Sequence, residues 1–338
     1  MNDRVRITEG YISKRRPPLN LAARDRGLFE HELRKTIPDA ELVLIRDAHI
    51  LDDVVLTTYA PFTYDRLTYA TPTGMKAAAR SSLHYLARLR LAAKRPRKVE
   101  EALWITDRVA GGYFHWFADA LCRLNAARKE KPRIPFMLSE ELATCAYVRG
   151  SLELLGEHDL VTYRPEEHVL VRSLWVPQHL ARTGNFNDPV LRDLQKRFED
   201  PLSTDADGRV FVSRSKAPTR RILNDTEVVA IMRDHGVAVV HMEDLTFEEQ
   251  VALMRRTRTL IGTHGAGLTN MLFMPPGGQI LEIRAAGDAH NNCYFTMASA
   301  LDHTYRYVLG EANHPLTQLA DLHVDPEALD AAMRIMLH

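Results

Sequence analysis

The sequence is poor in cysteine and in long apolar runs. Its 338 residues contain three cysteines, Cys122, Cys145 and Cys293, and none of them forms a C-x-x-C pair. Three thiols cannot build a disulfide framework, so we expect reduced and mostly buried side chains. No stretch approaches the roughly 18 apolar residues of a membrane-spanning helix, and the first residues lack the apolar segment of a signal peptide. These absences favour a cytoplasmic protein.

Neither sign of charge is in excess, because 44 Lys and Arg residues balance 44 Asp and Glu residues. This balance gives no general reason to expect nucleic acid as a partner. Residues 76–98 are a local exception, with eight Lys or Arg and no acidic residue. A basic helix there would suit anionic lipid and a peripheral position on the inner membrane face. The competing interpretation is a solvated surface helix, because its leucines do not share one face.

Segments typical of strands and helices alternate along most of the chain, which favours an α/β fold with parallel sheets. Residues 1–40 show no clear period, so we expect an irregular arm there. The expected strands are 41–46, 53–59, 102–106, 134–138, 160–163, 169–176, 209–213, 237–241, 259–263, 279–284 and 305–309. The expected helices are 76–98, 113–127, 139–155, 190–198, 225–235, 246–256, 291–301 and a last helix that begins at Asp325-Pro326, with a short helix after residue 265.

The length favours about two domains, since one domain usually has roughly 100–200 residues. Gly, Pro, Asn and Ser punctuate residues 181–207, which we interpret as a linker. We therefore predict an N-terminal domain over residues 1–180 and a C-terminal domain over residues 208–312. We expect residues 313–338 to form a helix that packs back on the N-terminal domain.

The stretch from residue 258 to residue 284 is the most informative part of the chain. It reads as a strand, a turn with Gly265 and Gly267, a short helix and a second strand. Glycines at such a turn let a ligand approach the backbone, and a helix start favours an anion. We expect a diphosphate on this helix start and Glu282 close to a ligand hydroxyl. The spacing matches neither G-x-G-x-x-G nor a Walker loop, so the motif alone is not specific.

A basic loop follows the strand that ends at Ser213. Its cations are Arg214, Lys216, Arg220 and Arg221. Guanidinium groups suit phosphate oxygens, although a solvated basic loop remains the alternative. No Asp-x-Asp pair lies at a comparable strand end, because Asp205 and Asp207 fall in the linker. This pattern favours charge compensation by arginine over Mg²⁺.

A second candidate site opens the helix expected from residue 113. His115 and Asp119 are four residues apart, so they share one helix face and can form a hydrogen bond. Such a pair is the minimum for a general base, and a helix-capping histidine beside an unrelated aspartate is the alternative. Adding His264 and His290 would suggest zinc, but no third ligand has metal-site spacing. We therefore expect no metal.

Three blocks carry a family resemblance: Gly-Gly-Tyr-Phe-His-Trp-Phe-Ala-Asp-Ala-Leu-Cys-Arg (111–123), Phe-Val-Ser-Arg with Arg-Arg-Ile-Leu-Asn (211–214 and 220–224), and Gly-Thr-His-Gly-Ala-Gly-Leu-Thr-Asn (262–270). Together they resemble glycosyltransferase family 61, formerly a domain of unknown function, in its bacterial capsule and lipopolysaccharide type. The resemblance covers roughly residues 100–310. It implies a GT-B-like fold, in which two Rossmann-like doubly wound domains face each other across a cleft. It also implies inverting transfer without an obligatory metal or cofactor.

Carried over by position, the resemblance places His115 and Asp119 at the reacting centre, with Asp119 favoured as the base. It implies that Glu282 accepts hydrogen bonds from ribose and that Glu243 lies near the nucleobase. Glu243 follows His241-Met where many relatives have Pro-Glu, and Cys122 replaces a more usual proline. The implied donor-binding residues are Arg214, Arg221, Asn224, Glu243, His264, Gly265, Ala266, Gly267, Thr269, Asn270 and Glu282.

The sequence thus predicts a hexosyl- or pentosyltransferase of bacterial surface polysaccharide synthesis. The expected donor is a nucleotide sugar, UDP-linked, and the expected acceptor is a hydroxyl of an oligosaccharide or lipid-linked glycan. One alternative is a nucleotide-sugar epimerase or hydrolase of GT-B shape, which would turn over the donor without an acceptor. Another is a non-catalytic nucleotide-sugar-binding protein, which would bind the donor and release no nucleotide.

Overall fold

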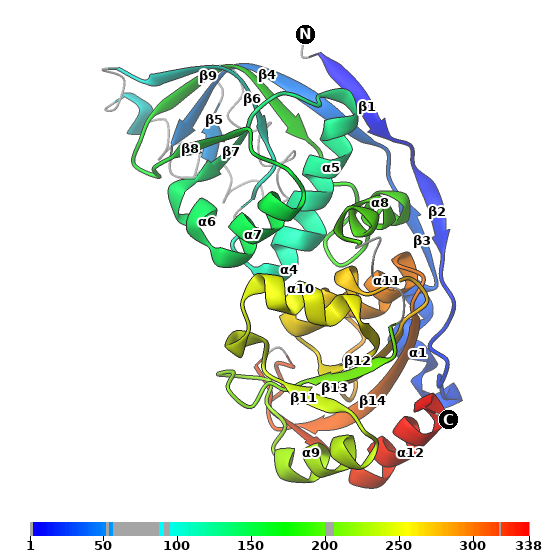
Figure 1. Cartoon of the computed structure of the whole chain (residues 1–338). Helices are drawn as coiled ribbons and strands as arrows, with labels where there is room; N and C mark the ends of the chain where they lie inside the picture. Colours follow the sequence, from blue (N-terminus) through cyan, green and yellow to red (C-terminus); the bar gives the residue numbers. More distant parts are fainter. Residues whose placement is uncertain are drawn as a thin grey trace. The chain divides into compact units, whose positions relative to one another are not determined.

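The computed structural model describes residues 3–51, 54–56, 88–90, 95–107, 109–199, 206–317 and 319–337 (Figure 1). The chain forms two compact units, each with its own sheet. The first unit is Met1–Tyr11 with Thr36–Leu194, and the second is Ile12–Lys35 with Gln195–His338. Within the described ranges, none of the helices combines the length and apolar character needed to cross a membrane.

The first unit is built on a mixed sheet of seven strands in the order β1-β4-β9-β6-β7-β8, with β5 paired to β4. Strands β9, β6, β7 and β8 are parallel, whereas β1 and β5 pair antiparallel with β4, and β4 pairs antiparallel with β9. The expectation of a parallel sheet therefore holds for only part of this unit. The strands are β1 (Arg4–Thr8), β4 (Ala40–Leu51), β5 (Val54–Leu56), β6 (Arg97–Trp104), β7 (Phe136–Ser139), β8 (Leu160–Tyr163) and β9 (Val169–Pro177).

One sequence prediction for the N-terminal part of the chain was wrong, and a second can be tested only at a few of its residues. The first forty residues are not an irregular arm, because β1 pairs with β4, and β2 (Tyr11–Lys14) pairs with β3 (Arg34–Ile37). The basic helix predicted over residues 76–98 lies mostly outside the described residues. Residues 88–90 are helical, but Arg97 and Lys98 already belong to β6, where Arg97 pairs in register with Val169 of β9.

The helices of the first unit begin where the parallel strands end. Ser139 caps the first of two short helices by accepting a hydrogen bond from the Leu142 amide at 3.3 Å, as predicted. The single helix predicted over residues 139–155 is interrupted at Cys145, whose ψ of 129° is not helical. The helical segments are α4 (Tyr113–His115), a π-helical segment (Trp116–Ala120), α5 (Leu121–Glu130), α6 (Glu140–Thr144), α7 (Ala146–Leu154) and α8 (Asp188–Phe198), which runs across the boundary between the units.

The second unit has a six-stranded sheet in the order β11-β10-β12-β13-β14-β15, parallel except for β15. All predicted strands of this unit are present, whereas β15 was not anticipated. The strands are β10 (Gly208–Val212), β11 (Ala238–Val240), β12 (Thr257–Thr263), β13 (Gln279–Ala285), β14 (Thr304–Ala312) and β15 (Leu322–Val324). The helices are α9 (Asp225–Asp234), α10 (Phe247–Arg255), α11 (Cys293–Ala300) and α12 (Pro326–Leu337).

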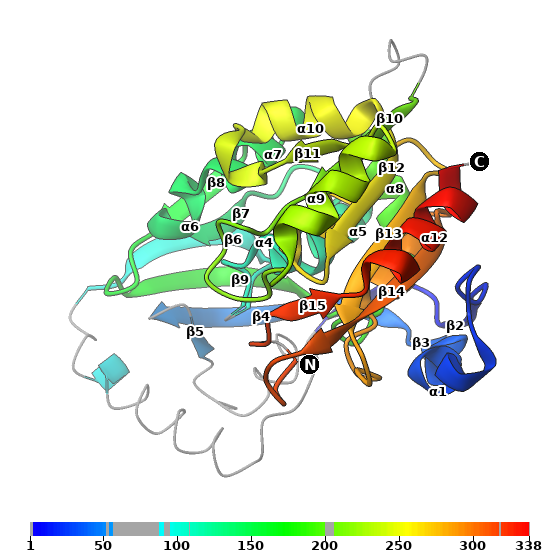
Figure 2. The ribbon, with the colours of Figure 1, turned by 90° about the horizontal axis from the view of Figure 1, so that it is seen from below.

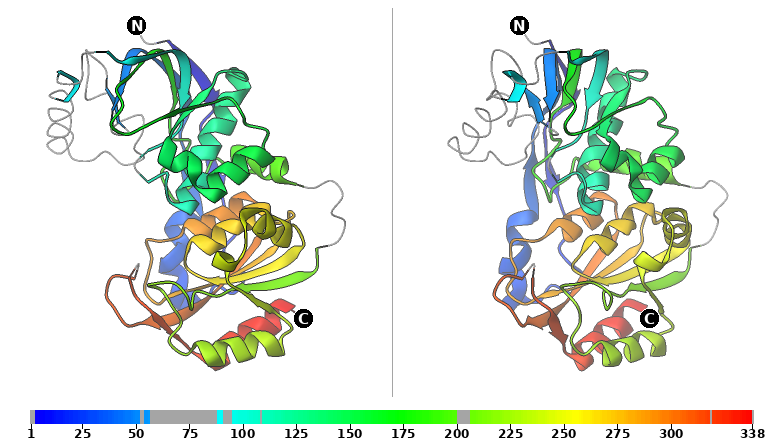
Figure 3. Two further views of the ribbon diagram at one scale, coloured as in Figure 1. Left: turned by 60° about the vertical axis from the view of Figure 1, so that its left-hand side comes forward. Right: turned by 90° about the vertical axis from the view of Figure 1, so that its left-hand side faces the viewer.

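Helices cover both faces of this second sheet, with α9 and α12 on one side and α10 and α11 on the other (Figure 1). The capping box of Thr246 and Glu249 at the start of α10 is confirmed. The prediction that the last helix packs on the N-terminal domain was wrong. Instead, α12 lies beside α9 in its own unit (Figure 3), where His235 Nε2 is 2.7 Å from Asp330 Oδ1.

The segment Ile12–Lys35 crosses from the N-terminus to the second unit, and we name it the strap. It contains the short helix α1 (Arg26–Phe29) between two 3-10 turns, Ala23–Asp25 and Glu30–Glu32. The strap lies along β14 (Figure 2), where the Leu19 amide donates to Tyr305 O at 2.9 Å and Asn20 Nδ2 donates to Tyr307 O at 2.7 Å. The second unit therefore includes residues from the N-terminal part of the chain as well as from the C-terminal part.

Candidate functional site

The glycine turn connects β12 to a 3-10 helix, Ala266–Phe273. A Cβ on Gly265 would lie 2.6 Å from Arg214 Nη1, and a Cβ on Gly267 would lie 2.7 Å from Val212 Cγ1. Real Cβ atoms do not approach other atoms this closely, so a larger residue at either position would have to displace the neighbouring side chain. The predicted close approach at Gly265 is thus made by the guanidinium of Arg214, at the carboxyl end of the neighbouring strand β10.

Arg214 keeps donors available for an anion at this turn. Its Nη2 donates to Thr219 O at 3.1 Å, while its buried Nε has no hydrogen-bond partner among the described residues. Burial, followed by the positive charge of Arg220, lowers the pKa of Arg214. Two guanidinium groups that repel each other beside a glycine turn form a site that an anion would neutralise.

Arg221, which the resemblance implied for the diphosphate, forms an ion pair with Asp321 in this structure. Its Nε and Nη2 donate to Asp321 Oδ2 at 3.2 and 2.9 Å, and its backbone amide donates to Asp321 Oδ1 at 2.9 Å. These contacts, the backbone bond first, hold the pKa of Asp321 below its ordinary value. Arg221 therefore anchors the loop, in a half-exposed ion pair.

Arg220 is the loop residue that lies beside Arg214. Its backbone has a positive φ of 59°, unusual for a residue other than glycine. Its side-chain Nε is buried without a hydrogen-bond partner in the described part of the chain, and its charge acts on both Arg214 and Tyr294. The sequence drew attention to Arg220 as one of four loop cations, without distinguishing it from its neighbour Arg221.

Glu282 does not present its carboxylate to a ligand. The residue is 0% exposed, with one oxygen bonded to His264 Nδ1 and the other accepting from the Tyr305 hydroxyl at 2.5 Å. Burial pushes the pKa of Glu282 upward, but His264 and Arg284 outweigh burial and hold the pKa below its ordinary value. The expectation that Glu282 reads ribose is therefore corrected. The ionised carboxylate fixes His264 Nδ1 and leaves Nε2 for a ligand.

Glu243 lines a pocket together with Arg214 and Gly267. Its negative charge acts on Arg214 and opposes the larger effects of burial and Arg220 on the pKa of that guanidinium. The nucleotide-side placement of Glu243 stays a prediction. The pocket is lined by Val212, Ser213, Arg214, Ala217, Met242, Glu243, Gly262, Thr263, Gly267 and Leu268.

The other residues predicted to bind the nucleotide-sugar donor lie in the turn and in the basic loop. Thr269 and Asn270 are buried, and Asn270 Nδ2 donates to Gly267 O at 3.1 Å. Asn224 pairs with the backbone of Val324, donating to its carbonyl at 2.8 Å and accepting from its amide at 3.0 Å. Asn224 thus supports the basic loop as expected. Ala266 begins the 3-10 helix.

In the first unit, His115 Nδ1 lies 2.8 Å from Asp119 Oδ2, as the spacing predicted. The pair spans the start of the π-helical segment, which widens the helix locally. The hydrogen bond to Asp119 raises the pKa of His115, against the opposing effect of partial burial. The His115 side chain is 29% exposed and that of Asp119 is 10% exposed, so the imidazole is the more accessible partner.

Sequence reasoning missed a second acid–histidine pair beside the first. Asp107 Oδ2 lies 3.4 Å from His179 Nε2. Burial opposes ionisation of Asp107, but its hydrogen bonds with His179 and the Val109 amide hold its pKa below the ordinary value. The charge of Asp107 also contributes to the raised pKa of His115. The position of Asp107, three residues after strand β6, is the signal that would have found it.

Arg123 organises the loops around these pairs. It is buried and donates to Pro177 O at 2.9 and 2.7 Å and to Ile105 O at 2.8 Å. It thereby ties together the carboxyl ends of β6 and β9. Cys122 is buried next to it, and burial raises the pKa of its thiol, so this cysteine is a packing residue. Within the described ranges, no three His, Cys, Asp or Glu side chains converge on a common point as metal ligands would.

The family described as Glycosyltransferase 61 matches residues 113–281, which is half of the chain. The match begins before His115 and ends just before Glu282, and it therefore includes the glycine turn and the basic loop. The strap lies outside it.

The chain is also similar to enzymes named "EGF domain-specific O-linked N-acetylglucosamine transferase". It is 32% identical to the protein of Drosophila melanogaster over 141 residues, 38% of this chain and 26% of that protein. It is 32% identical to that of Bos taurus over 118 residues, 33% of this chain and 22% of that protein. The similarity to these relatives thus spans about a quarter of their length.

Proposed function

The chain belongs to glycosyltransferase family 61, and from that premise we propose that it transfers a sugar from a nucleotide-sugar donor to a hydroxyl acceptor. The observation that carries the proposal is the Arg214 guanidinium against the Gly265 turn, where the charge of Arg220 also acts on it. The buried Nε of each guanidinium has no hydrogen-bond partner among the described residues. A diphosphate supplies the negative charge and the acceptor oxygens that this arrangement calls for.

The donor diphosphate binds at the Gly265 turn in this proposal. Arg214 and Arg220 donate to its oxygens, the first amides of the 3-10 helix add further donors, and His264 donates through Nε2. Charge develops on the leaving diphosphate in the transition state, so donors fixed in advance stabilise that state more than the ground state. Arginine and histidine provide this stabilisation without an obligatory metal. Glu243 lies on the nucleoside side.

The acceptor hydroxyl loses its proton to the His115–Asp119 pair. The more exposed imidazole and its raised pKa favour His115 as the base, with Asp119 holding Nδ1, and this reverses our expectation from the sequence. The acceptor oxygen then attacks the anomeric carbon opposite the diphosphate, which inverts that centre. This part of the proposal requires a GT-B arrangement, in which the two units face each other across a cleft.

For the donor we propose a UDP-linked sugar and test N-acetylglucosamine first, since the names of the animal relatives specify that sugar. For the acceptor we propose a glycan hydroxyl, free or lipid-linked, in bacterial surface polysaccharide synthesis. The enzyme would act in the cytoplasm, close to the inner membrane face. A synthetic acceptor panel that includes folded EGF domains and lipid-linked glycans separates this acceptor class from the one named for the relatives.

The test is transfer from UDP-N-acetylglucosamine and other UDP-sugars with EDTA present, followed by release of UDP and by mass of the product. Wild type should release UDP only when an acceptor is present, and Arg214→Ala should lose about 10²–10³-fold in rate, as expected for one lost transition-state donor. Lys216→Ala on the same loop is the control, because Lys216 pairs with Asp244 at the surface. Donor turnover independent of any acceptor would instead indicate a hydrolase or epimerase.

A further inference from the structure

We propose that the strap is a working part of the donor site, in which Phe29 is a positioning residue that holds Glu282 against His264. The inference rests on the proposed role of His264 at the diphosphate. It assigns a function to a segment that lies outside the family match at residues 113–281.

Phe29 is the point at which the strap enters the interior of the second unit. The side chain is 0% exposed, and its ring centroid lies 5.3 Å from that of Phe295, 6.1 Å from that of Tyr305 and 5.0 Å from that of Tyr307. The Arg284 guanidinium carbon lies 5.0 Å from the same ring centroid. The aromatic contacts and the cation–π contact each favour a fixed geometry. Phe29 therefore covers Arg284 and Tyr305 together.

Arg284 and Tyr305 are the two groups that stabilise Glu282 from the side opposite His264. The Tyr305 hydroxyl donates to Glu282, and the charge of Arg284 lowers the pKa of the Glu282 carboxyl. A buried carboxylate is stable only when it is paired and hydrogen-bonded. Phe29 keeps water from Arg284 and so preserves the strength of its interaction with Glu282.

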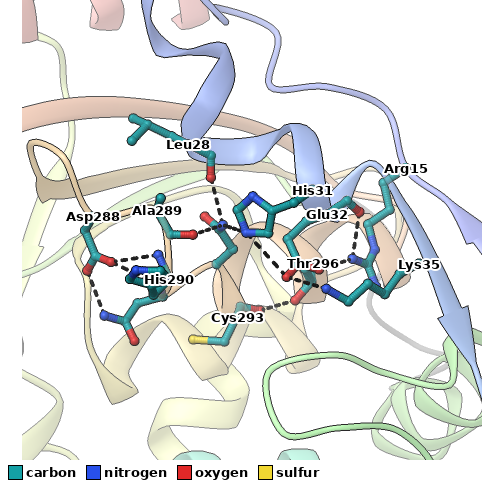
Figure 4. Close-up of polar contacts among 12 residues, drawn as sticks. Arg15, Leu28, His31, Glu32, Lys35, Asp288, Ala289, His290, Cys293 and Thr296 are labelled. Carbon is teal, nitrogen blue, oxygen red and sulfur yellow. Dashed lines mark hydrogen bonds and ion pairs between the residues drawn. The ribbon is translucent and has the colours of Figure 1, made fainter.

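Polar contacts fix the strap at the same place. Asn292 Nδ2 donates to Leu28 O at 2.9 Å, while its Oδ1 accepts from Arg284 Nη1 at 2.8 Å. One buried amide thus joins the strap backbone to the cation beneath Phe29. Figure 4 shows Leu28 and His31 of the strap facing the segment that carries Ala289 and Cys293.

The strap is also closed on itself, which holds Phe29 in position. Arg15 Nη1 lies 3.0 Å from Glu32 Oε2, and Lys35 Nζ lies 2.9 Å from Glu32 Oε1 (Figure 4). The Arg15 amide donates to Leu33 O at 2.9 Å. The short helix that carries Phe29 is therefore held between two paired ends.

The consequence is a continuous set of contacts from Phe29 through Arg284 and Tyr305 to Glu282 and His264. Replacing the ring should leave the fold in place but loosen the Glu282 carboxylate, so that His264 no longer keeps Nδ1 protonated toward it. Outer partners that orient a histidine ligand in metal sites contribute about 10–100-fold, and we expect a loss of about tenfold in UDP affinity here.

The experiment compares Phe29→Leu with Leu19→Ala in the full chain. Leu19 is also on the strap, but its side chain is 57% exposed and its contact with Tyr305 is made by the backbone. UDP binding is measured by calorimetry, and His264 is followed by its ¹⁵N imidazole signals, which report the protonated nitrogen directly. Phe29→Leu should weaken UDP binding about tenfold and shift the His264 signals, while Leu19→Ala should do neither.

A double-mutant cycle provides a second readout. Tyr305→Phe removes only the hydroxyl that donates to Glu282, so its effect on UDP affinity should be less than additive with that of Phe29→Leu. If Phe29→Leu is poorly folded, Phe29→Met carries the same test with a flexible side chain that fills irregular core space. Full additivity, or a folded Phe29 variant with wild-type UDP affinity and His264 signals, would overturn the inference.

Arg214→Ala separates this inference from the proposed function. If Arg214→Ala binds UDP as the wild type does, the donor site itself is misplaced. If Arg214→Ala loses binding while the folded Phe29 variants retain it, the donor site stands and the role of the strap is refuted.

Discussion

Replacement of Glu282 by glutamine is the perturbation whose consequences the structure defines most closely. The substitution keeps the shape of the side chain and removes its charge. The glutamine side chain can still accept a hydrogen bond from Tyr305. It presents either an amide NH₂ or an uncharged oxygen to His264 Nδ1. Arg284 is then buried without a carboxylate nearby. Removing one partner of a buried ion pair typically costs about 3–5 kcal/mol.

The magnitude follows from the complete burial of Glu282. For a unit of this size, each kcal/mol corresponds to about 2–4 °C in Tm, so Glu282→Gln should lower the Tm of the second unit by on the order of 10 °C at pH 7. Glu311→Gln is the matched control, since Glu311 is exposed on the adjacent strand β14. Differential scanning calorimetry, with urea unfolding as a second measure, gives the comparison.

The pH dependence of this difference has a definite sign. The pKa of Glu282 is lower in the folded protein than its unfolded value of about 4.3. The carboxylate therefore contributes stability above that pH, and the contribution is lost as the pH falls through the folded pKa. The gap between wild type and Glu282→Gln should narrow in acid. A Glu282→Gln protein as stable as Glu311→Gln at pH 7 would refute the reasoning.

Three further predictions concern the binding loop, the base and the glycine turn. Arg220→Ala should weaken UDP binding more than tenfold, while Arg221→Ala should change UDP affinity little and lower the free energy of unfolding by about 1 kcal/mol. Calorimetry with UDP measures the affinities, and urea unfolding measures the stabilities. Equal losses of UDP affinity in the two variants would contradict the assignment. His115→Gln should reduce kcat about 10²–10⁴-fold, because it removes the general base. The wild-type kcat/KM should rise with pH through a pKa above 6.5, since the neutral imidazole is the base and Asp119 raises its pKa. That pKa should be lower in Asp119→Asn, and an unchanged pH profile in this variant would refute the pairing. Gly265→Ala should weaken UDP binding without unfolding the protein, because the new Cβ would lie 2.6 Å from Arg214 Nη1 and would displace that guanidinium. An alanine variant with wild-type UDP affinity, measured in the same titration, would contradict this prediction.

The second sheet was predictable because its strands are short, apolar and regularly separated by helices. The Thr246 capping box and Pro326 at the first position of α12 are local signals, and local signals survive into the structure. The antiparallel half of the first sheet was not predictable in this way. Strand β1 has no fully buried residue, and it becomes a strand by pairing with β4, more than thirty residues further along the chain.

In the site, the sequence predicted which residues matter but not which partners their side chains contact. The sequence identified the glycine turn, the basic loop and the His115–Asp119 pair, since each depends on spacing within one segment. It could not decide between Arg220 and Arg221, because the ion pair of Arg221 with Asp321 joins residues a hundred positions apart in the chain. Nor could it show that Glu282 is enclosed, since its burial depends on Tyr305 and on a strap from the far N-terminus.

The central claim is that Arg214 and Arg220 form a diphosphate site at the Gly265 turn. The most direct measurement is the ratio of UDP affinity to uridine affinity, with EDTA present, in the wild type and in the Arg214→Ala/Arg220→Ala double variant. Two charge-assisted contacts of about 1.5 kcal/mol each correspond to about 100-fold. The account predicts a wild-type ratio of at least about 100 that collapses in the double variant. A ratio near one in the wild type, or an unchanged ratio in the double variant, would contradict it.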